Sequence, residues 1–293
     1  MTLRLGLLAW GVQPGGSLEA WALRLDCEVA HARRHGAELL VMPEYAPMEA
    51  AFGQQPDLSG ELSRAVALAP AMLVAAANVA RRHGVWLLPG TMPFAVGDAV
   101  VNRAPLIGPD GQAAFQDKHV MTRFEAEQWG IAPGRPPCVF DTALGRVGIA
   151  ICFDAEFPTL VRAQVEAGAW LVLVPSCTDT MHGFSRVRIA AAARALENQC
   201  FVAVAPTVGT APWSASLDAN RGFAAVFGPV DRGFPEDGIV ARGALDEPGW
   251  VFAELDPMRL AAVREDGAVR NHARWPAPPP ASAAAPRRRV LAG

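Results

Sequence analysis

The chain has 293 residues, of which 51% are hydrophobic and 19% are charged, a balance that excludes a largely disordered protein. Its formal net charge of -3 supplies no basic field for phosphates, so nucleic acid is not an expected partner. Its 5 cysteines form an odd set without CxxC spacing, which argues against a disulfide framework and a structural zinc site. A reducing, cytoplasmic location is therefore expected.

The sequence predicts no membrane-spanning segment. The longest weakly polar run, 65–80, is interrupted by Pro70 and Asn78 and is shorter than the roughly 18 residues that a span requires. The start of the chain, residues 1–4 with Arg4 followed by the apolar run 5–12, faintly resembles a signal peptide, but no small-residue cleavage site follows it, so we expect an ordinary first strand there.

Apolar, partly β-branched runs alternate with helical segments along the first two-thirds of the chain. Strands are expected at 3–10, 39–42, 85–88, 147–152, 170–174 and 201–205. Helices are expected at 18–35, 61–83, 159–167 and 184–198, three of them followed or ended by a glycine. Hairpins, at 100–117 and at 138 onward, make the predicted sheet mixed.

These elements predict a layered α/β architecture with two facing sheets and helices outside. No linker interrupts residues 1–275, which we interpret as one domain. The Pro/Ala/Arg-rich segment 276–293 cannot build a core, so a mobile tail is expected.

Three polar residues, Glu44, Lys118 and Cys152, stand at the C-terminal ends of predicted strands, where α/β sheets place their functional sites. Taken singly, Glu44 and Lys118 are typical surface residues, and Cys152 is typical of a small buried side chain. Lys118 also opens a long polar segment, 118–135, and long loops in compact domains often carry function.

Other catalytic patterns fit less well. A nucleophile elbow requires small residues two positions either side of the nucleophile, but Ala150 and Asp154 flank Cys152. No Walker or Rossmann fingerprint is present. A cysteine–histidine pair remains open, and the fold would have to assemble it from His119, His182 or His272.

Taken together, the segment 41–44 (VMPE), Lys118 and the segment 148–158 (GIAICFDAEFP) resemble the nitrilase, or carbon-nitrogen hydrolase, superfamily. The order Glu, Lys, Cys is its signature, and the similarity covers roughly residues 1–275. The resemblance implies a four-layer αββα sandwich that commonly dimerises, hydrolysis of nonpeptide C–N bonds in small molecules, and no metal or organic cofactor.

The chemistry of the three residues agrees with that resemblance. A free thiol has a pKa near 8.5, so Cys152 needs a base, and Glu44 is suited to take its proton. The Lys118 ammonium and the Phe153 backbone N–H are suited to stabilise a tetrahedral oxyanion.

Many members of the family carry a second glutamate near the lysine, and Glu125 and Glu127 compete for that place. We choose Glu127, because its spacing ahead of Gly134 resembles that of the family. The resemblance implies that this acid orients Lys118 and the substrate.

The sequence also departs from common members. Glu156 stands where better-known branches often have arginine, and 206–209 replaces an asparagine-containing segment. Glu156 either favours a substrate with a cationic group or is a helix-start acid stabilised by the local dipole. Tyr45, Cys177 and Thr178 are expected to line the pocket.

The sequence thus favours a thiol-dependent amidase that converts an amide or carbamoyl compound to acid and ammonia through a Cys152 thioester. Nitrile hydrolysis, acyl transfer by the same triad, and a noncatalytic ligand-binding role are the alternatives. The expected partners are a small-molecule substrate and a second copy of the chain, with neither nucleic acid nor membrane.

Overall fold

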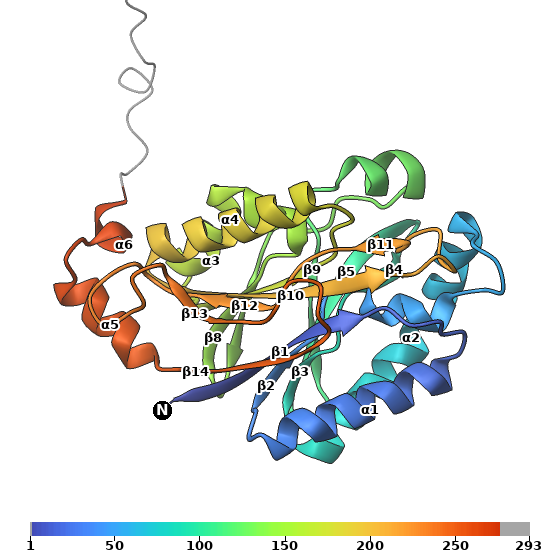
Figure 1. The fold of residues 1–293 in the computed structure, drawn as a ribbon, viewed down its shortest axis with the longest axis horizontal. Coiled ribbons are helices and arrows are strands. Elements are labelled where there is room, and N and C mark those ends of the chain that lie inside the picture. The colour runs from blue at the N-terminus through green and yellow to red at the C-terminus, as the bar shows by residue number, and fades with distance from the viewer. Residues whose placement is uncertain (1, 276–293) are drawn as a thin grey trace, which may run out of the picture.

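The structure is a computed structural model that describes residues 2–275, so the tail expected at 276–293 lies outside the described residues. Two mixed sheets face each other at its centre (Figure 1). The first contains β1 (Leu3–Gly11), β2 (Leu39–Val41), β3 (Trp86–Leu88), β4 (Met92–Val96), β5 (Ala99–Ile107), β6 (Ala113–Asp117) and β14 (Gly249–Leu255). The second contains β7 (Val139–Thr142), β8 (Gly145–Ile149), β9 (Leu171–Ser176), β10 (Phe201–Thr210), β12 (Ala225–Phe227) and β13 (Ile239–Arg242).

The two sheets are joined at one end. The last residues of β1 pair in parallel with β10, at Trp10 with Thr207 and Gly11 with Val208. The short strand β11 (Ala219–Asn220) pairs with the end of β10 at the same side of the molecule. This junction brings the C-terminal ends of strands from both sheets close together.

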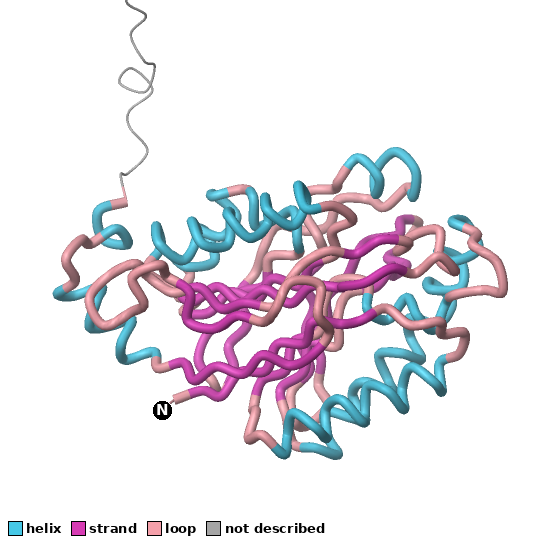
Figure 2. Tube along the Cα trace, in the orientation of Figure 1, coloured by secondary structure: helices cyan, strands magenta, loops and turns pink. Residues whose placement is uncertain are grey.

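Helices cover the outer face of each sheet (Figure 2). On the first sheet lie α1 (Leu18–Arg34) and α2 (Leu58–His83), and on the second lie α3 (Pro158–Glu166) and α4 (Met181–Asn198). The chain continues through α5 (Pro257–Asp266) and α6 (Asn271–Arg274), which lie at the end of α4. The layers are therefore helix, sheet, sheet, helix, and the predicted four-layer αββα sandwich is confirmed.

Strand β1 explains why the predicted strands are nearly continuous apolar runs. Leu5 and Leu7 point into the core that the second sheet shares. Leu8 and Trp10 alternate with them and pack into the core under α1 and α2. A strand covered on both faces needs apolar residues at every position, not at every second one.

The predicted helices match the observed ones to within a few residues. The sequence did not predict β4, the last four strands, or α5 and α6, several of which are two to four residues long and carry little periodic signal. The segment after Lys118, expected as a loop, contains a π-helical turn, η2 (Phe124–Trp129).

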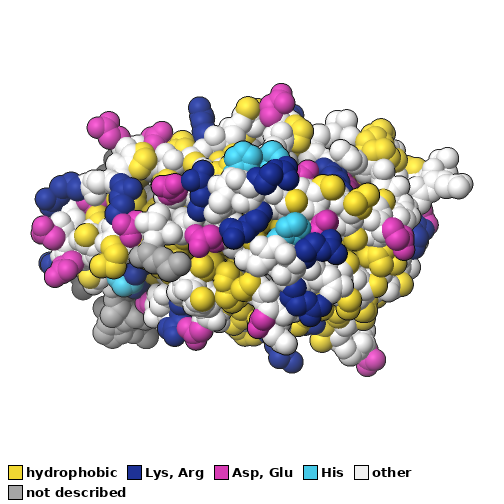
Figure 3. Space-filling view, turned by 90° about the horizontal axis from the view of Figure 1, so that it is seen from below, with side chains coloured by type: hydrophobic (Ala, Val, Ile, Leu, Met, Phe, Trp, Pro, Cys, Tyr) yellow, Lys and Arg dark blue, Asp and Glu magenta, His cyan; other side chains and the backbone are white. Residues whose placement is uncertain are grey.

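One described helix, α2, is long and apolar enough to cross a membrane by length and composition alone. Here it is an outer layer of the sandwich that packs against α1 and β4, and it buries the carboxylate of Glu61. The face that α1 and α2 present to the outside mixes basic, acidic and apolar side chains (Figure 3). The helix thus has a defined place in the globular fold.

Candidate active site

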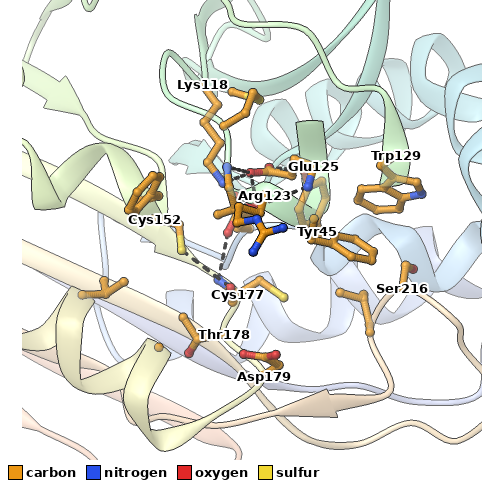
Figure 4. Close-up of a pocket in the computed structure, with 18 of the residues that line it drawn as sticks. Tyr45, Lys118, Arg123, Glu125, Trp129, Cys152, Cys177, Thr178, Asp179 and Ser216 are labelled. Atoms are coloured by element: carbon orange, nitrogen blue, oxygen red, sulfur yellow. Dashed lines mark hydrogen bonds and ion pairs between the residues drawn. The ribbon is translucent and has the colours of Figure 1, made fainter. Parts of the chain in front are cut away.

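A cavity of about 680 Å³ lies where strands of both sheets end, and Glu44, Lys118 and Cys152 all line it (Figure 4). Glu44 follows β2, Lys118 follows β6 directly, and Cys152 follows β8. The three residues that the sequence singled out at strand ends are therefore brought together in one pocket.

The backbone turns sharply at Cys152. The residue opens the 3₁₀ turn η3 (Cys152–Glu156) with a φ of 48°, in the left-handed region that a residue with a Cβ rarely adopts. Such a conformation costs about 1–3 kcal/mol and persists where surrounding structure enforces it, often at functional sites. The turn presents the thiol at the floor of the pocket.

Lys118 lies between two buried carboxylates. Its Nζ donates hydrogen bonds to Glu44 Oε1 at 2.8 Å and to Glu125 Oε2 at 2.6 Å. The side chains of Lys118 and Glu44 are 1% exposed, and that of Glu125 is 2% exposed. Buried charges of this kind are stable only when paired and hydrogen-bonded, as they are here.

Three further groups complete this network: Asn102 and Thr122, which the sequence did not single out, and Tyr45, which was expected to line the pocket. Asn102, inside β5, donates from Nδ2 to Glu44 Oε1 at 2.8 Å and to Glu125 Oε1 at 3.2 Å. The hydroxyl of Tyr45 donates to Glu125 Oε1 at 2.6 Å. The backbone N–H and the hydroxyl of Thr122 both donate to Glu125 Oε2 at 2.9 Å. An asparagine within an apolar strand was the one signal that pointed to Asn102.

The choice of Glu127 as the acid beside Lys118 is corrected by this geometry. Glu127 is 57% exposed and pairs with Arg123, whose Nε lies 2.9 Å from Glu127 Oε1. Residues two positions apart on a helical turn do not share a face, so when Glu125 points inward Glu127 points outward. Glu125 therefore occupies the position expected for Glu127.

Close backbone packing holds Lys118 in place. The N–H of Gly134 donates to the carbonyl of Lys118 at 2.7 Å. A Cβ at Gly134 would lie 2.2 Å from the Cβ of Asp117 and 2.7 Å from the Lys118 carbonyl oxygen, so no larger residue fits there. Asp154 accepts hydrogen bonds from the N–H groups of His119 and Val120, which ties the lysine segment to the cysteine turn.

The cysteine lies against the end of β9. The Ser176 hydroxyl donates to Cys152 Sγ at 3.5 Å, and the thiol itself points to the carbonyl of Cys177 at 3.6 Å. The N–H of Cys177 donates to Glu44 Oε2 at 3.0 Å. One short segment thus orients both the thiol and the carboxylate.

Burial raises the pKa of Glu44 to about 7, with Lys118 and Glu125 acting on it in opposite directions. Burial and the negative charge of Glu44 raise the pKa of the Cys152 thiol well above its ordinary value. Burial alone would lower the pKa of Lys118, but the two carboxylates raise it well above its ordinary value. At neutral pH the lysine is charged, the thiol is protonated and Glu44 is able to accept a proton.

The other residues expected in the site also line the pocket. These are Tyr45, Phe153, Glu156, Cys177 and Thr178. Glu156 forms an ion pair with Arg186, with its Oε1 3.3 Å from Arg186 Nε. No histidine is among the described lining residues, so the geometry does not support a cysteine–histidine pair.

The family model for carbon-nitrogen hydrolase matches residues 11–264. The chain is 30% identical over 254 residues to a deaminated glutathione amidase from Synechocystis, covering 82% of this chain and 88% of that protein. It is 27% identical over 206 residues to omega-amidase NIT2-B from Xenopus laevis, covering 67% of this chain and 71% of that protein. It is also 34% identical over 194 residues to a probable hydrolase, YhcX, from Bacillus subtilis, covering 66% of this chain and 38% of that longer protein.

Solved structures agree in fold. Nit3 from Saccharomyces cerevisiae, described as a member of branch 10 of the nitrilase superfamily, superposes with a TM-score of 0.72 at 21% identity, covering 90% of this chain and 93% of that one. An amidase from Nesterenkonia sp. AN1 superposes with a TM-score of 0.72 at 25% identity, covering 93% of this chain and 99% of that one. The chain belongs to the carbon-nitrogen hydrolase family of the nitrilase superfamily and is an enzyme of the amidase type that acts on nonpeptide C–N bonds.

Proposed function

We propose that the protein hydrolyses a small amide to a carboxylic acid and ammonia, with Cys152 as nucleophile, Glu44 as general base and acid, and Lys118 as the oxyanion donor. The observation that carries the proposal is the bridging of Glu44 and Glu125 by Lys118 at the floor of the cavity that also holds Cys152. Glu125 is assigned the role of orienting Lys118.

In the first step the Cys152 sulfur attacks the amide carbonyl carbon while Glu44 removes the thiol proton. The transfer accompanies attack because burial raises the thiol pKa far above neutrality, so little free thiolate exists at rest. Glu44, with a pKa of about 7, is ionised in a large fraction of molecules at neutral pH and accepts the proton.

The carbonyl oxygen becomes an oxyanion in the tetrahedral intermediate. The Lys118 ammonium and the backbone N–H of Phe153 are the donors assigned to it. Because the side chain of Lys118 is buried, water screens its charge only weakly, which strengthens its interaction with the oxyanion. Glu44 then gives its proton to the departing nitrogen, ammonia leaves, and a thioester remains on Cys152.

Water completes the cycle. Glu44 removes a proton from a water molecule that attacks the thioester carbonyl, the carboxylic acid is released, and the thiolate regains a proton. The net reaction consumes one water for each amide and releases one ammonia. Because relatives of this chain are described as amidases, we propose an amide and not a nitrile as its substrate.

The test is ammonia release from a panel of small amides, carbamoyl compounds and nitriles, comparing the wild type with Cys152→Ala. We expect the variant to lose at least about 10⁴-fold in kcat/KM while its melting temperature stays close to that of the wild type. A folded variant that keeps wild-type activity would refute the thiol mechanism, and acceptor-dependent product in place of free acid would indicate acyl transfer.

We also propose that the protein forms a homodimer. The outer face of α4 supports this assignment, because Ile189 is 57% exposed and Leu196 is 41% exposed. Ile189→Asp is expected to shift the sedimentation coefficient from that of a dimer to that of a monomer, and a wild type that sediments as a monomer would refute it.

We propose a reducing, cytoplasmic location as well. All five cysteines lie within the described residues and are free thiols. Thiol titration of the protein in extracts prepared with a trapping reagent is expected to find every cysteine reduced, and a disulfide in the trapped protein would contradict this location.

A further inference from the structure

A second buried carboxylate, remote from the catalytic network, holds a wall of the same pocket. Glu61, in the first turn of α2, is 0% exposed. It accepts hydrogen bonds from the hydroxyl of Ser214 at 2.9 Å, from the N–H of Ala215 at 2.8 Å and from both the N–H and the hydroxyl of Ser216. Every one of these donors comes from three consecutive residues.

No cationic side chain pairs with Glu61 among residues 2–275. The two carboxylate oxygens of Glu61 accept hydrogen bonds from four donors, which fits an ionised carboxylate because it has acceptors and no donor. Charge-assisted hydrogen bonds are about twice as strong as neutral ones. The segment 214–216 is thus docked on the helix by hydrogen bonds to a single buried charge.

That segment is the tip of a loop between two paired strands. The loop leaves β10 and returns in β11, where Gly209 pairs with Asn220 and Thr210 with Ala219. The strand pairing fixes the ends of the loop, and a hydrogen bond of 3.0 Å from the Leu217 N–H to the Ser214 hydroxyl shapes its tip without anchoring it to another element. Glu61, from a helix that belongs to the other sheet, fixes the tip.

The tip and a neighbouring tryptophan form one side of the pocket, which we call the distal wall and define as 214–217 with Trp129. Ala215, Ser216, Leu217 and Trp129 line the cavity. The indole N–H of Trp129 donates to the carbonyl of Leu58 at 3.4 Å, in the same first turn of α2. In Figure 4, Trp129 and Ser216 lie together on the side of the pocket away from Cys152.

We infer that Glu61 is a positioning residue that fixes the distal wall and thereby makes the enzyme select for the length of the acyl chain. This inference rests on the proposed amide hydrolysis at Cys152. A short acyl group is held at the floor and does not reach the wall, whereas a longer chain gains apolar contact with Trp129 and Leu217. Substrates long enough to touch the wall therefore depend on Glu61, and short ones do not.

The test compares Glu61→Gln with the wild type on acetamide, butyramide and hexanamide. The glutamine side chain replaces one acceptor oxygen with an NH₂ donor that faces other donors. The tip of the loop therefore loses hydrogen bonds that hold it on α2. We expect kcat/KM for hexanamide to fall about tenfold through a higher KM, with acetamide changed less than twofold. An equal loss at every chain length would overturn the inference, because a merely structural defect would not depend on the substrate.

Two variants serve as controls. Glu19→Gln makes the same chemical change at an exposed position in the first turn of α1 and is expected to leave all three amides unchanged. Ser216→Ala removes the hydroxyl that donates to Glu61 and retains the backbone N–H that also donates to it. This variant tests the inference if Glu61→Gln does not fold. We expect it to lower kcat/KM for hexanamide two- to threefold and for acetamide not at all, and equal losses would again overturn the inference.

Alkylation separates this inference from the proposed hydrolysis, because it requires no turnover. The rates at which 2-bromoacetamide and 2-bromohexanamide alkylate Cys152 are measured by mass spectrometry in the wild type and in Glu61→Gln. We expect the ratio of the long to the short reagent to fall about tenfold in the variant. If this ratio falls while no amide is hydrolysed, the hydrolysis proposal fails and the role of Glu61 stands; if hydrolysis depends on Cys152 but the ratio is unchanged, the role of Glu61 fails alone.

Discussion

The charged side chains at the floor of the pocket are buried, whereas those at its rim are exposed to solvent. At the floor, Lys118 contacts Glu44 and Glu125, and none of the three side chains is more than 2% exposed. At the rim, Arg123 pairs with Glu127 at exposed fractions of 88% and 57%. Removing one partner of a buried pair leaves a charge without compensation, whereas an exposed pair contributes about 0–1 kcal/mol. Equivalent substitutions in the two regions should therefore differ sharply in effect.

The largest effect is expected at the floor, from Glu44→Gln. Glutamine has a similar size but cannot accept the thiol proton, so kcat/KM for amide hydrolysis should fall by about 10³-fold or more. Ammonia release measures the loss, and circular dichroism verifies that the variant is folded. A folded variant that keeps a tenth of the wild-type activity would exclude Glu44 as the general base.

A matched pair of substitutions tests the comparison directly. Glu125→Gln should lower kcat/KM by about 10²-fold, because Lys118 loses a carboxylate that orients it. It should also lower the free energy of unfolding by about 3 kcal/mol, measured in urea. Glu127→Gln, two residues along the same turn, should change activity less than twofold. The reverse ranking would restore Glu127 as the supporting acid.

The sequence predicted the layered fold and singled out Glu44, Lys118 and Cys152 at the ends of predicted strands, and the resemblance to the nitrilase superfamily implied that the three meet in one pocket. It could not separate Glu125 from Glu127, since the inward direction depends on the π-helical turn and on Thr122, which donates to Glu125. Asn102 was missed for a similar reason. Its role is visible only when β5 lies beside the two carboxylates, a contact between residues far apart in the chain.

A further prediction concerns Asn102, whose side-chain amide donates hydrogen bonds to both buried carboxylates. With a Glu44 pKa of about 7, kcat/KM of the wild type should fall as the pH drops below about 7, because protonated Glu44 cannot accept the thiol proton. The Asn102 amide donates to the ionised carboxylates and favours them, so Asn102→Leu should move this acid limb to higher pH. At pH 7 the loss should be about tenfold.

The pH profile separates this effect from simple destabilisation. A variant that is only less stable would lose activity at all pH values and keep the midpoint of the acid limb. An unchanged midpoint in folded Asn102→Leu would therefore mean that Asn102 supports the fold without tuning Glu44.

A small effect on substrate preference is expected at the rim, from Glu156→Gln. Glu156 lines the pocket and is 18% exposed, but Arg186, itself 60% exposed, lies 3.3 Å away and offsets its charge. The preference for 5-aminopentanamide over hexanamide, which has the same length and no charge, should fall two- to threefold in kcat/KM. Arg186→Gln should raise the same preference, because it leaves the carboxylate uncompensated. If neither variant changes the ratio, the rim charges do not select the substrate, and Glu156 is better explained as an acid at the start of a helix.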